Sequence, residues 1–221
     1  MKAVTYPIIY PDSDGLPMAD NTEQYHWISY LKANLDVVFV DQEVFVAGDL
    51  LWYPVEGNPK IRVAPDVLVA FDRPKGYRGS YMQWLEDGVA PQVVFEILSP
   101  GNHPLEMSKK LSFYGQYGVQ EYYAYDPDSF EFAAWVRRGD LLWLLDAKDT
   151  ANWISPRLSI RFMSAPDAKL RVFHPDGREF ITLVEAEAEK KQLQQRAESE
   201  FGRAERLAAK LRELGINPEN V

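Results

Sequence analysis

Cysteine is absent from this 221-residue sequence, and histidine is rare. Without cysteine the chain can have no disulfide, no thiolate nucleophile and no cysteine-ligated zinc. The three histidines, His26, His103 and His174, are too scattered along the sequence for a histidine-rich metal site. These absences leave the carboxylates as the first residues to consider for catalysis or metal binding.

The sequence also lacks an excess of positive charge, long apolar runs and a secretory signal. Its formal net charge of −9 argues against tight, non-specific binding to nucleic acid. No apolar run approaches the length that a bilayer requires, and the N-terminal MKAVTYPIIYPDSDG has no basic and then apolar pattern. A hydrophobic content of 46% suffices for a sizeable core. We therefore expect a soluble, cytoplasmic protein without membrane association.

The composition separates a folded domain, residues 1–183, from a charged C-terminal helix, residues 184–221. Within the domain, residues 1–20 are rich in proline and aspartate and predict an irregular arm. The apolar positions of a first predicted helix are Tyr25, Ile28, Leu31 and Leu35. Strand-like runs follow, with an expected hairpin around residues 56–59, a short helix at 80–88 and a longer helix at 104–118. This order predicts an α/β domain with a mixed central sheet flanked by helices.

The charged segment from Glu185 to Glu213 contains no proline, and its acidic and basic residues cancel. Apolar residues recur there at a spacing of nearly three and four, interrupted by Glu200: Leu193, Ala197, Ala204, Leu207, Leu211 and Leu214. Such a narrow apolar stripe between charges of both signs is typical of a coiled coil. We therefore expect a homodimer through this helix, with folding back onto the domain as the alternative.

Two acidic residues occur inside apolar strands. Glu96 lies in PQVVFEILSPGN and Asp66 in RVAPDVLVAF, where most neighbours are apolar. Carboxylates on adjacent strands would repel each other and raise each other's pKa values, unless a cation joins them. Mg²⁺ accepts one or two carboxylates and takes further ligands from water and phosphate oxygens. A shared metal is one reading of the pair, and bonds to nearby turns or backbone groups are the other.

Four motifs in a fixed order extend this pattern. PDVLVAF, VVFEILSPGN, KKLSFYGQYGVQEYYAYDPD and the charged C-terminal helix together resemble the Uma-two family of restriction-endonuclease-like proteins, within the PD-(D/E)XK nuclease superfamily. The resemblance implies a restriction-endonuclease-like fold and hydrolysis of phosphodiester bonds in DNA with Mg²⁺, for which Mn²⁺ can substitute. It makes Asp66 and Glu96 catalytic, metal-binding acids, and it adds the carbonyl of Ile97 as a third ligand.

The chain departs from the superfamily pattern at residue 98. A lysine is expected two residues after the glutamate, yet Leu98 occupies that position. The Uma-two pattern implies that a lysine on the following helix replaces it, and K-L-x-x-Y places this catalytic residue at Lys110. Helical spacing puts Lys110 on one side with Glu106 and Tyr114. A surface ion pair with Glu106 is an equally compatible role for Lys110.

The residues leave open whether the chain is an active enzyme. One alternative is a catalytically degenerate nuclease fold that binds or assembles through its C-terminal helix, because Leu98 and the acidic charge favour that function. A second alternative is a hydrolase of a small phosphoester, which needs no basic DNA-binding face. Three basic residues of the loop DRPKGYRGSY, Arg73, Lys75 and Arg78, could meet phosphates or remain solvated. Glu23 is a weaker candidate acid on the first helix.

Overall fold

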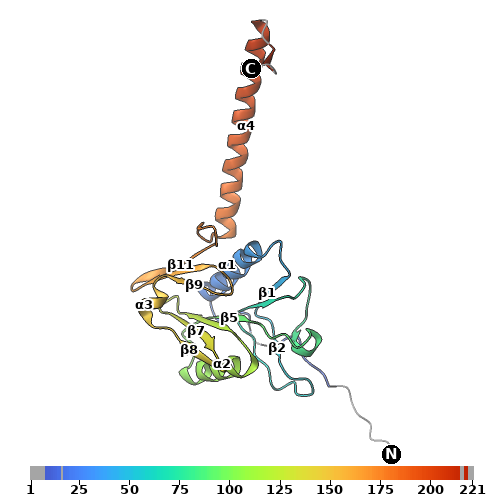
Figure 1. Cartoon of the computed structure of the whole chain (residues 1–221), viewed down its shortest axis with the longest axis vertical. Helices are drawn as coiled ribbons and strands as arrows, with labels where there is room; N and C mark the ends of the chain where they lie inside the picture. The colour runs from blue at the N-terminus through green and yellow to red at the C-terminus, as the bar shows by residue number, and fades with distance from the viewer. Residues whose placement is uncertain (1–7, 16, 215–216, 219–221) are drawn as a thin grey trace, which may run out of the picture. The chain divides into compact units, whose positions relative to one another are not determined.

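The computed structural model describes residues 8–15, 17–214 and 217–218. The chain divides into two compact units, Met1–Phe180 and Ile181–Val221, and each is described here by itself. The first half of unit 1 contains α1 (Thr22–Val38), β1 (Val44–Gly48), β2 (Trp52–Tyr53), β3 (Val67–Phe71), β4 (Tyr81–Met82), a 3₁₀ turn η1 (Gln83–Leu85) and β5 (Val93–Ile97). Its second half contains α2 (Pro104–Tyr117), β6 (Glu121–Tyr125), β7 (Phe132–Arg138), β8 (Leu141–Leu144), α3 (Ala147–Thr150), β9 (Trp153–Ile154), β10 (Arg161–Ala165) and β11 (Ala168–Phe173). Unit 2 contains α4 (Leu183–Glu213) (Figure 1).

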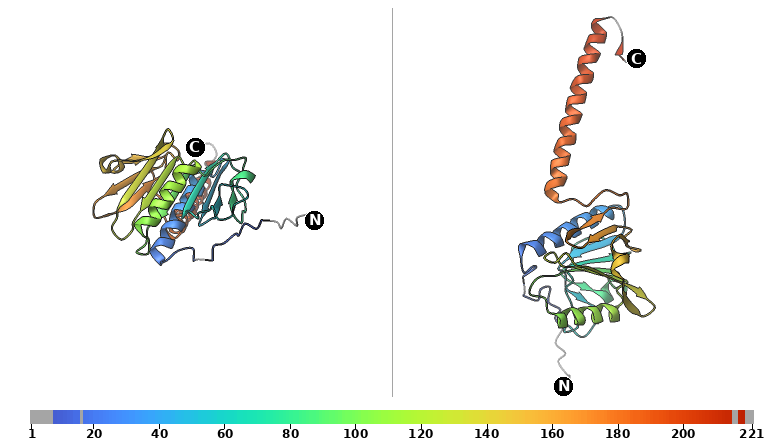
Figure 2. Two further views of the ribbon diagram at one scale, coloured as in Figure 1. Left: turned by 90° about the horizontal axis from the view of Figure 1, so that it is seen from below. Right: turned by 90° about the vertical axis from the view of Figure 1, so that its left-hand side faces the viewer.

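A six-stranded sheet in the order β1-β3-β5-β6-β7-β8 forms the centre of unit 1. β5 and β6 run parallel, and every other neighbouring pair in this sheet is antiparallel. The connection between the two parallel strands is α2, as a parallel crossover requires. Figure 2 shows α1 and α2 on opposite faces of the sheet. The expected α/β class, a mixed sheet flanked by helices, is confirmed.

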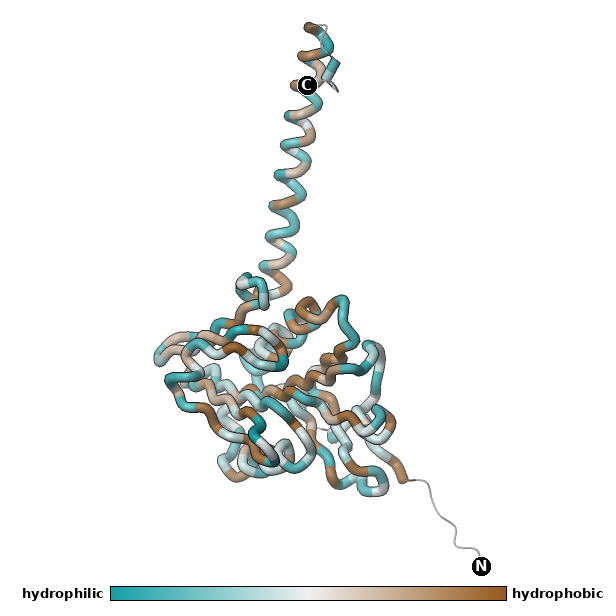
Figure 3. Tube along the Cα trace, viewed as in Figure 1, coloured by the Kyte–Doolittle hydropathy of each residue, from teal (hydrophilic) through white to brown (hydrophobic). Residues whose placement is uncertain are grey.

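Two apolar clusters fill the two sides of the central sheet. Trp27 and Leu31 of α1 pack on one face together with Phe95, whereas Tyr114 of α2 packs on the other face with Val94. Alternate residues of β5 therefore enter different clusters, because successive side chains of a strand point to opposite faces. Because α1 covers one face of the sheet and α2 covers the other, β5 is apolar at nearly every position. Figure 3 shows the hydrophobic residues concentrated in these central strands.

The buried face of α1 differs by one position from the predicted stripe. Asn21 caps the helix through its side-chain oxygen, which accepts a hydrogen bond from the Gln24 backbone N–H at 2.8 Å. The buried residues are Gln24, Trp27, Ile28, Leu31, Asn34 and Leu35. Tyr25, expected on the apolar stripe, is exposed. The polar Gln24 occupies the stripe at this end of the helix, where it reaches the ends of the sheet strands.

Two local predictions were wrong. The expected hairpin around residues 56–59 is reduced to a single bridge between Trp52 and Val63. β3 instead joins the central sheet between β1 and β5, because its residues are apolar on both faces. The expected helix at 80–88 is a short strand, β4, followed by one 3₁₀ turn. β4 pairs in parallel with β2, a long-range contact that local spacing does not reveal.

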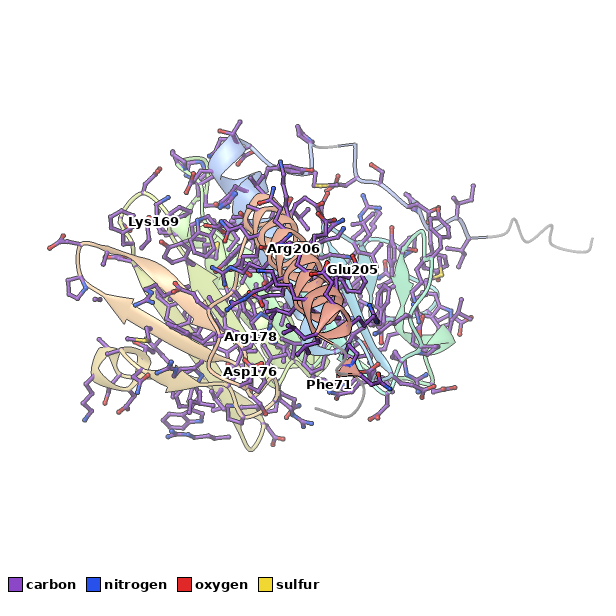
Figure 4. The ribbon with its side chains drawn as sticks, turned by 90° about the horizontal axis from the view of Figure 1, so that it is seen from above. Phe71, Lys169, Asp176, Arg178, Glu205 and Arg206 are labelled. Carbon is purple, nitrogen blue, oxygen red and sulfur yellow. The ribbon has the colours of Figure 1, made fainter. Side chains whose placement is uncertain are left out.

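A three-stranded sheet, β11-β10-β9, completes unit 1. After β11 the chain turns at residues 174–177, where the Gly177 N–H donates to the His174 carbonyl at 2.9 Å. Asp176 and Arg178, labelled in Figure 4, form an ion pair of 2.8 Å across this turn. The turn returns the chain to Phe180, the last core residue of the unit.

α4 begins at a capping box and continues for 31 residues. The Thr182 hydroxyl accepts a hydrogen bond from the Glu185 N–H, and the Glu185 carboxylate accepts one from the Thr182 N–H. No residue of α4 is buried, and its side chains project around the helix in Figure 4, where Glu205 and Arg206 are labelled. Of the helices that the structure describes, none combines the length and apolar character that a bilayer crossing requires.

Candidate functional site

Asp66 and Glu96 lie beside each other in the sheet. β3 and β5 pair in antiparallel register with Val67 opposite Phe95, so the next position places Asp66 opposite Glu96. Such directly opposed residues have side chains on the same face, within contact distance. The Asp66 carboxylate also accepts a hydrogen bond of 2.6 Å from the backbone N–H of Ile97. Both acids are buried, with exposed fractions of 8% for Asp66 and 2% for Glu96.

Two side chains of α2 hold the Glu96 carboxylate. The Lys110 ammonium donates to one carboxylate oxygen at 2.7 Å, and the Tyr114 hydroxyl donates to the other oxygen. Lys110 and Tyr114 are four residues apart and therefore share one side of the helix. The ion pair is largely shielded from solvent, since the Lys110 side chain is 18% exposed. Lys110 thus pairs with Glu96 across the core, and it does not form the surface pair with Glu106 that was the alternative.

Burial and like charge shift the ionisation of both acids. Burial, followed by the charge of Glu96, raises the pKa of Asp66 to about 8. Burial also raises the pKa of Glu96, although the Lys110 charge and the hydrogen bonds from Lys110 and Tyr114 oppose this effect. Burial alone would lower the pKa of Lys110, but the charge of Glu96 outweighs it and the net pKa is raised. The site therefore holds a protonated lysine and favours additional positive charge.

Gln24 is a site residue that sequence reasoning missed. Its side-chain amide donates to the Ile97 carbonyl at 2.9 Å and accepts from the Asp20 N–H at 2.8 Å. A further hydrogen bond to Asp66 lowers the pKa of that acid. Its position three residues before Trp27 and four before Ile28, on the buried stripe, was the available signal. Glu23 instead points away from the two acids and forms an exposed ion pair with Lys169 at 3.1 Å.

Asp49 is a second missed acid. It follows β1, and its backbone N–H donates to the Asp66 carbonyl at 3.1 Å. Burial and the charge of Asp14 raise the pKa of Asp49 to about 6, while the charges of Lys110 and Glu96 also act on it. Its positive φ of 47° places it in a conformation that non-glycine residues rarely adopt. Asp49 therefore adds a third carboxylate to the electrostatic surroundings of Glu96.

The predicted basic loop is engaged in internal contacts. Arg73 pairs with Asp87 at 2.6 Å, and Arg78 forms a two-pronged contact with Glu86 at 2.5 and 3.1 Å. Lys75 donates to two backbone carbonyls after the end of α1, each at 2.6 Å. These side chains fasten the loop to the domain, which leaves them less available for phosphates than the sequence suggested.

The donor set beside Asp66 fits a magnesium ion. Within the described part of the chain, no group of three or more histidine, cysteine, aspartate or glutamate side chains could hold a metal. Mg²⁺ requires only one or two carboxylates, however, and completes its shell with water and other oxygens. The Ile97 carbonyl keeps a second lone pair beside the bond from Gln24. The Tyr122 hydroxyl is buried without a hydrogen-bond partner among the described residues, and the charges of Glu96 and Asp66 act on it.

The fold and site define an α/β protein with two buried acids on neighbouring central strands of a mixed sheet, and a lysine on the helix that covers them. A family model described as "Uma2: Putative restriction endonuclease" matches residues 20–195. The chain therefore belongs to the Uma2 (Uma-two) family, as the sequence motifs indicated, and this membership supports a nuclease. No match was found among curated proteins.

Among solved structures, the chain is similar to one whose title reads "a putative nuclease" from Anabaena variabilis ATCC 29413. The identity is 17% and the TM-score is 0.46, over 63% of this chain and 75% of the other.

The shifted pKa of Asp66 predicts a falling stability with rising pH in metal-free buffer. Its folded value of about 8 exceeds the ordinary value of 3.8, so the folded state binds a proton that the unfolded state has lost between these pH values. The free energy of unfolding should therefore fall from about pH 4 to about pH 8 and level off above. Between these pH values, the free energy of unfolding of the wild type should fall by at least about 1.4 kcal/mol more than that of Asp66→Asn. This difference is the equivalent of one pKa unit. Urea titrations in EDTA measure the difference, and parallel pH profiles would contradict it.

Proposed function

We propose that this chain is a magnesium-dependent endonuclease that hydrolyses phosphodiester bonds in DNA, with water as the nucleophile. The observation that carries the proposal is the buried pair of Asp66 and Glu96, with the Lys110 ammonium 2.7 Å from Glu96. Membership of the Uma2 family supports the reaction class. Acids brought together without enough positive charge are the arrangement expected of a cation site that also faces an anionic substrate.

Asp66, Glu96 and the Ile97 carbonyl would hold the cation, and Mn²⁺ can use the same oxygen ligands. When bound, the ion would polarise a phosphate oxygen and lower the pKa of a coordinated water. Gln24 would orient the Ile97 carbonyl through their hydrogen bond of 2.9 Å. The Ile97 N–H would hold Asp66 in place in the same way, at 2.6 Å.

Lys110 would stabilise negative charge that develops on the phosphate. Its raised pKa keeps the ammonium protonated at neutral pH, so it would act as a fixed cation and hydrogen-bond donor rather than as a base. Leu98, at the position where the superfamily has lysine, lines an apolar pocket of about 230 Å³ with Met107 and Leu111. The positive charge that is missing at position 98 would thus come from Lys110 on α2.

A non-catalytic binding or assembly module is the second candidate. Both oxygens of Glu96 already accept hydrogen bonds, from Lys110 and from Tyr114. A carboxylate whose hydrogen bonds are satisfied in this way can have a purely structural role in an ion pair. The lysine that the superfamily has at position 98 is also absent, because this chain has Leu98. The two functions differ in whether the pair binds a cation and whether DNA is cleaved, and both properties can be measured.

Metal binding is tested by calorimetric titration with Mg²⁺ and with Mn²⁺. Asp66→Asn and Glu96→Gln should each weaken binding by at least tenfold, because each removes a charged oxygen ligand while keeping the side-chain shape. Glu121→Gln is the matched control, since Glu121 is equally buried but lies on the α1 side of the sheet with Tyr123. Unchanged affinity in both site variants would contradict the shared metal.

Lys110→Met should abolish cleavage of DNA while leaving metal affinity within about threefold, because an ammonium is not a metal ligand. Losing one donor to developing charge typically costs about a hundredfold to a thousandfold in kcat. Lys148→Met is the control, since Lys148 of α3 also pairs with an acid, Asp146, but both side chains are exposed. Retained cleavage in Lys110→Met would assign Lys110 a structural role.

We also propose that α4 pairs with a second copy of the chain. Leu193, Leu207 and Leu214 are all more than half exposed, so unit 2 by itself leaves the apolar stripe uncovered. A stripe flanked by charges of both signs fits a two-stranded seam, which Glu200 and Gly202 weaken near its middle. Such a dimer would contain two metal sites, one in each copy.

Two identical substitutions on different faces of α4 test the dimer. Ala204→Asp enters the apolar stripe and should raise the dimer dissociation constant by at least tenfold. Ala209→Asp adds the same charge outside the stripe and should leave it nearly unchanged. Light scattering over a concentration series measures both, together with a chain that ends at Leu183. Equal behaviour of the two variants, or a dimer that survives the truncation, would exclude α4 as the dimer interface.

A further inference from the structure

An open groove of about 550 Å³ runs beside α2. One wall is the chain segment from Lys60 to Arg62, and the other is the outer side of α2 with Lys109, Phe113 and Tyr117. The remaining lining residues are uncharged, so three cations and no carboxylate face this space. The groove is distinct from the acid pair, which lies under the inner side of the same helix.

The charge of the groove is opposite to that of the protein. The chain carries a formal net charge of −9, yet Lys60, Arg62 and Lys109 form no ion pair within the described residues. Among the described residues, the Arg62 guanidinium donates only to the Tyr53 hydroxyl, at 3.4 Å. The basic residues of the loop after β3, in contrast, are used in internal contacts. Unpaired cations gathered in a hollow of an acidic protein favour an anionic ligand.

Two aromatic rings give the groove a second property. Phe113 and Tyr117 are partly buried, with ring centroids 4.6 Å apart. The fully buried ring of Trp52 contacts both of them, with its centroid 5.4 Å from that of Phe113 and 6.5 Å from that of Tyr117. A fixed aromatic surface next to cations is the combination on which unpaired nucleobases stack while their phosphates are neutralised. A paired duplex would not expose its base faces to these rings.

Both walls of the groove belong to chain segments that also carry residues of the acid site. Arg62 precedes Asp66 by four residues, and Lys109 precedes Lys110 by one. On α2, with a rotation of about 100° per residue, Phe113 and Tyr117 lie on the side adjacent to Lys110. A strand held in the groove would therefore lie against the same two segments that carry Asp66 and Lys110.

We propose that this groove binds an unpaired strand of DNA, with phosphates at Lys60, Arg62 and Lys109 and a base on the rings of Phe113 and Tyr117. The choice of DNA over another anionic polymer rests on the proposed function. The groove supplies locally the positive potential that the whole chain lacks. It thereby reconciles an acidic protein with an anionic substrate.

Binding is measured by fluorescence anisotropy with a labelled single-stranded oligonucleotide in EDTA, which removes divalent cations. Lys60→Gln combined with Lys109→Gln should weaken binding at least tenfold and reduce the salt dependence of log Kd by about 1.4, the value for two lost phosphate contacts. The control combines Lys148→Gln with Arg178→Gln, which makes the same change in net charge at other exposed positions. No binding by the wild type, or equal weakening in the two double variants, overturns the proposal.

Photocrosslinking tests the stacked base without disturbing the fold. An oligonucleotide containing 5-iododeoxyuridine should crosslink to Phe113 or Tyr117, identified by mass spectrometry, and the crosslink should decline in the Lys60→Gln and Lys109→Gln double variant. Crosslinks confined to other residues overturn the proposal. Because neither experiment needs metal or turnover, a chain that binds here but never cleaves contradicts only the proposed nuclease. If the protein cleaves DNA but fails these two binding tests, only the proposed binding of a strand in the groove is contradicted.

Discussion

The contact on which the rest of the site depends is the buried ion pair between Glu96 and Lys110. A carboxylate that is 2% exposed inside an apolar cluster is costly unless it is paired and hydrogen-bonded. Lys110 and Tyr114 meet that requirement together from one side of α2. The helix can therefore dock on the sheet in only one rotation that satisfies Glu96. That same rotation places Lys109, Phe113 and Tyr117 along the groove.

Asp66 makes the charge balance of the site incomplete. Lys110 supplies one positive charge, whereas Asp66 and Glu96 supply two acids on opposed positions of neighbouring strands. The protein relieves this imbalance in the absence of other ions by keeping Asp66 protonated, as its pKa of about 8 indicates. A divalent cation would relieve it differently, by making both ionised carboxylates favourable. The same buried group thus lowers stability at high pH and would create the affinity for a cation that the proposed catalytic centre requires.

The sequence revealed the parts of the site that disturb a local pattern. Glu96 and Asp66 interrupt apolar strands and were visible from their neighbours, whereas Lys110 was identified only through the resemblance to the Uma-two family. Gln24 and Asp49 were missed because a glutamine in a first helical turn and an aspartate after a strand are both ordinary. Their importance comes from contacts with Ile97 and Asp66, which only the strand pairing creates. The pairing of β2 with β4 escaped for the same reason, since neither strand has a periodic pattern of its own.

The acidic composition argued against nucleic acid as a ligand, but net charge describes a whole molecule and a substrate meets one surface. Counterion screening limits the effect of a charge to about 8 to 10 Å under ordinary salt conditions. At that range a phosphate in the groove would experience Lys60, Arg62 and Lys109 more than the distant acids that make up the total. The overall negative charge would still oppose non-specific association elsewhere on the protein. An acidic chain with one basic, aromatic groove is therefore suited to selective binding of a single strand, where a uniformly basic chain would bind any DNA along its surface.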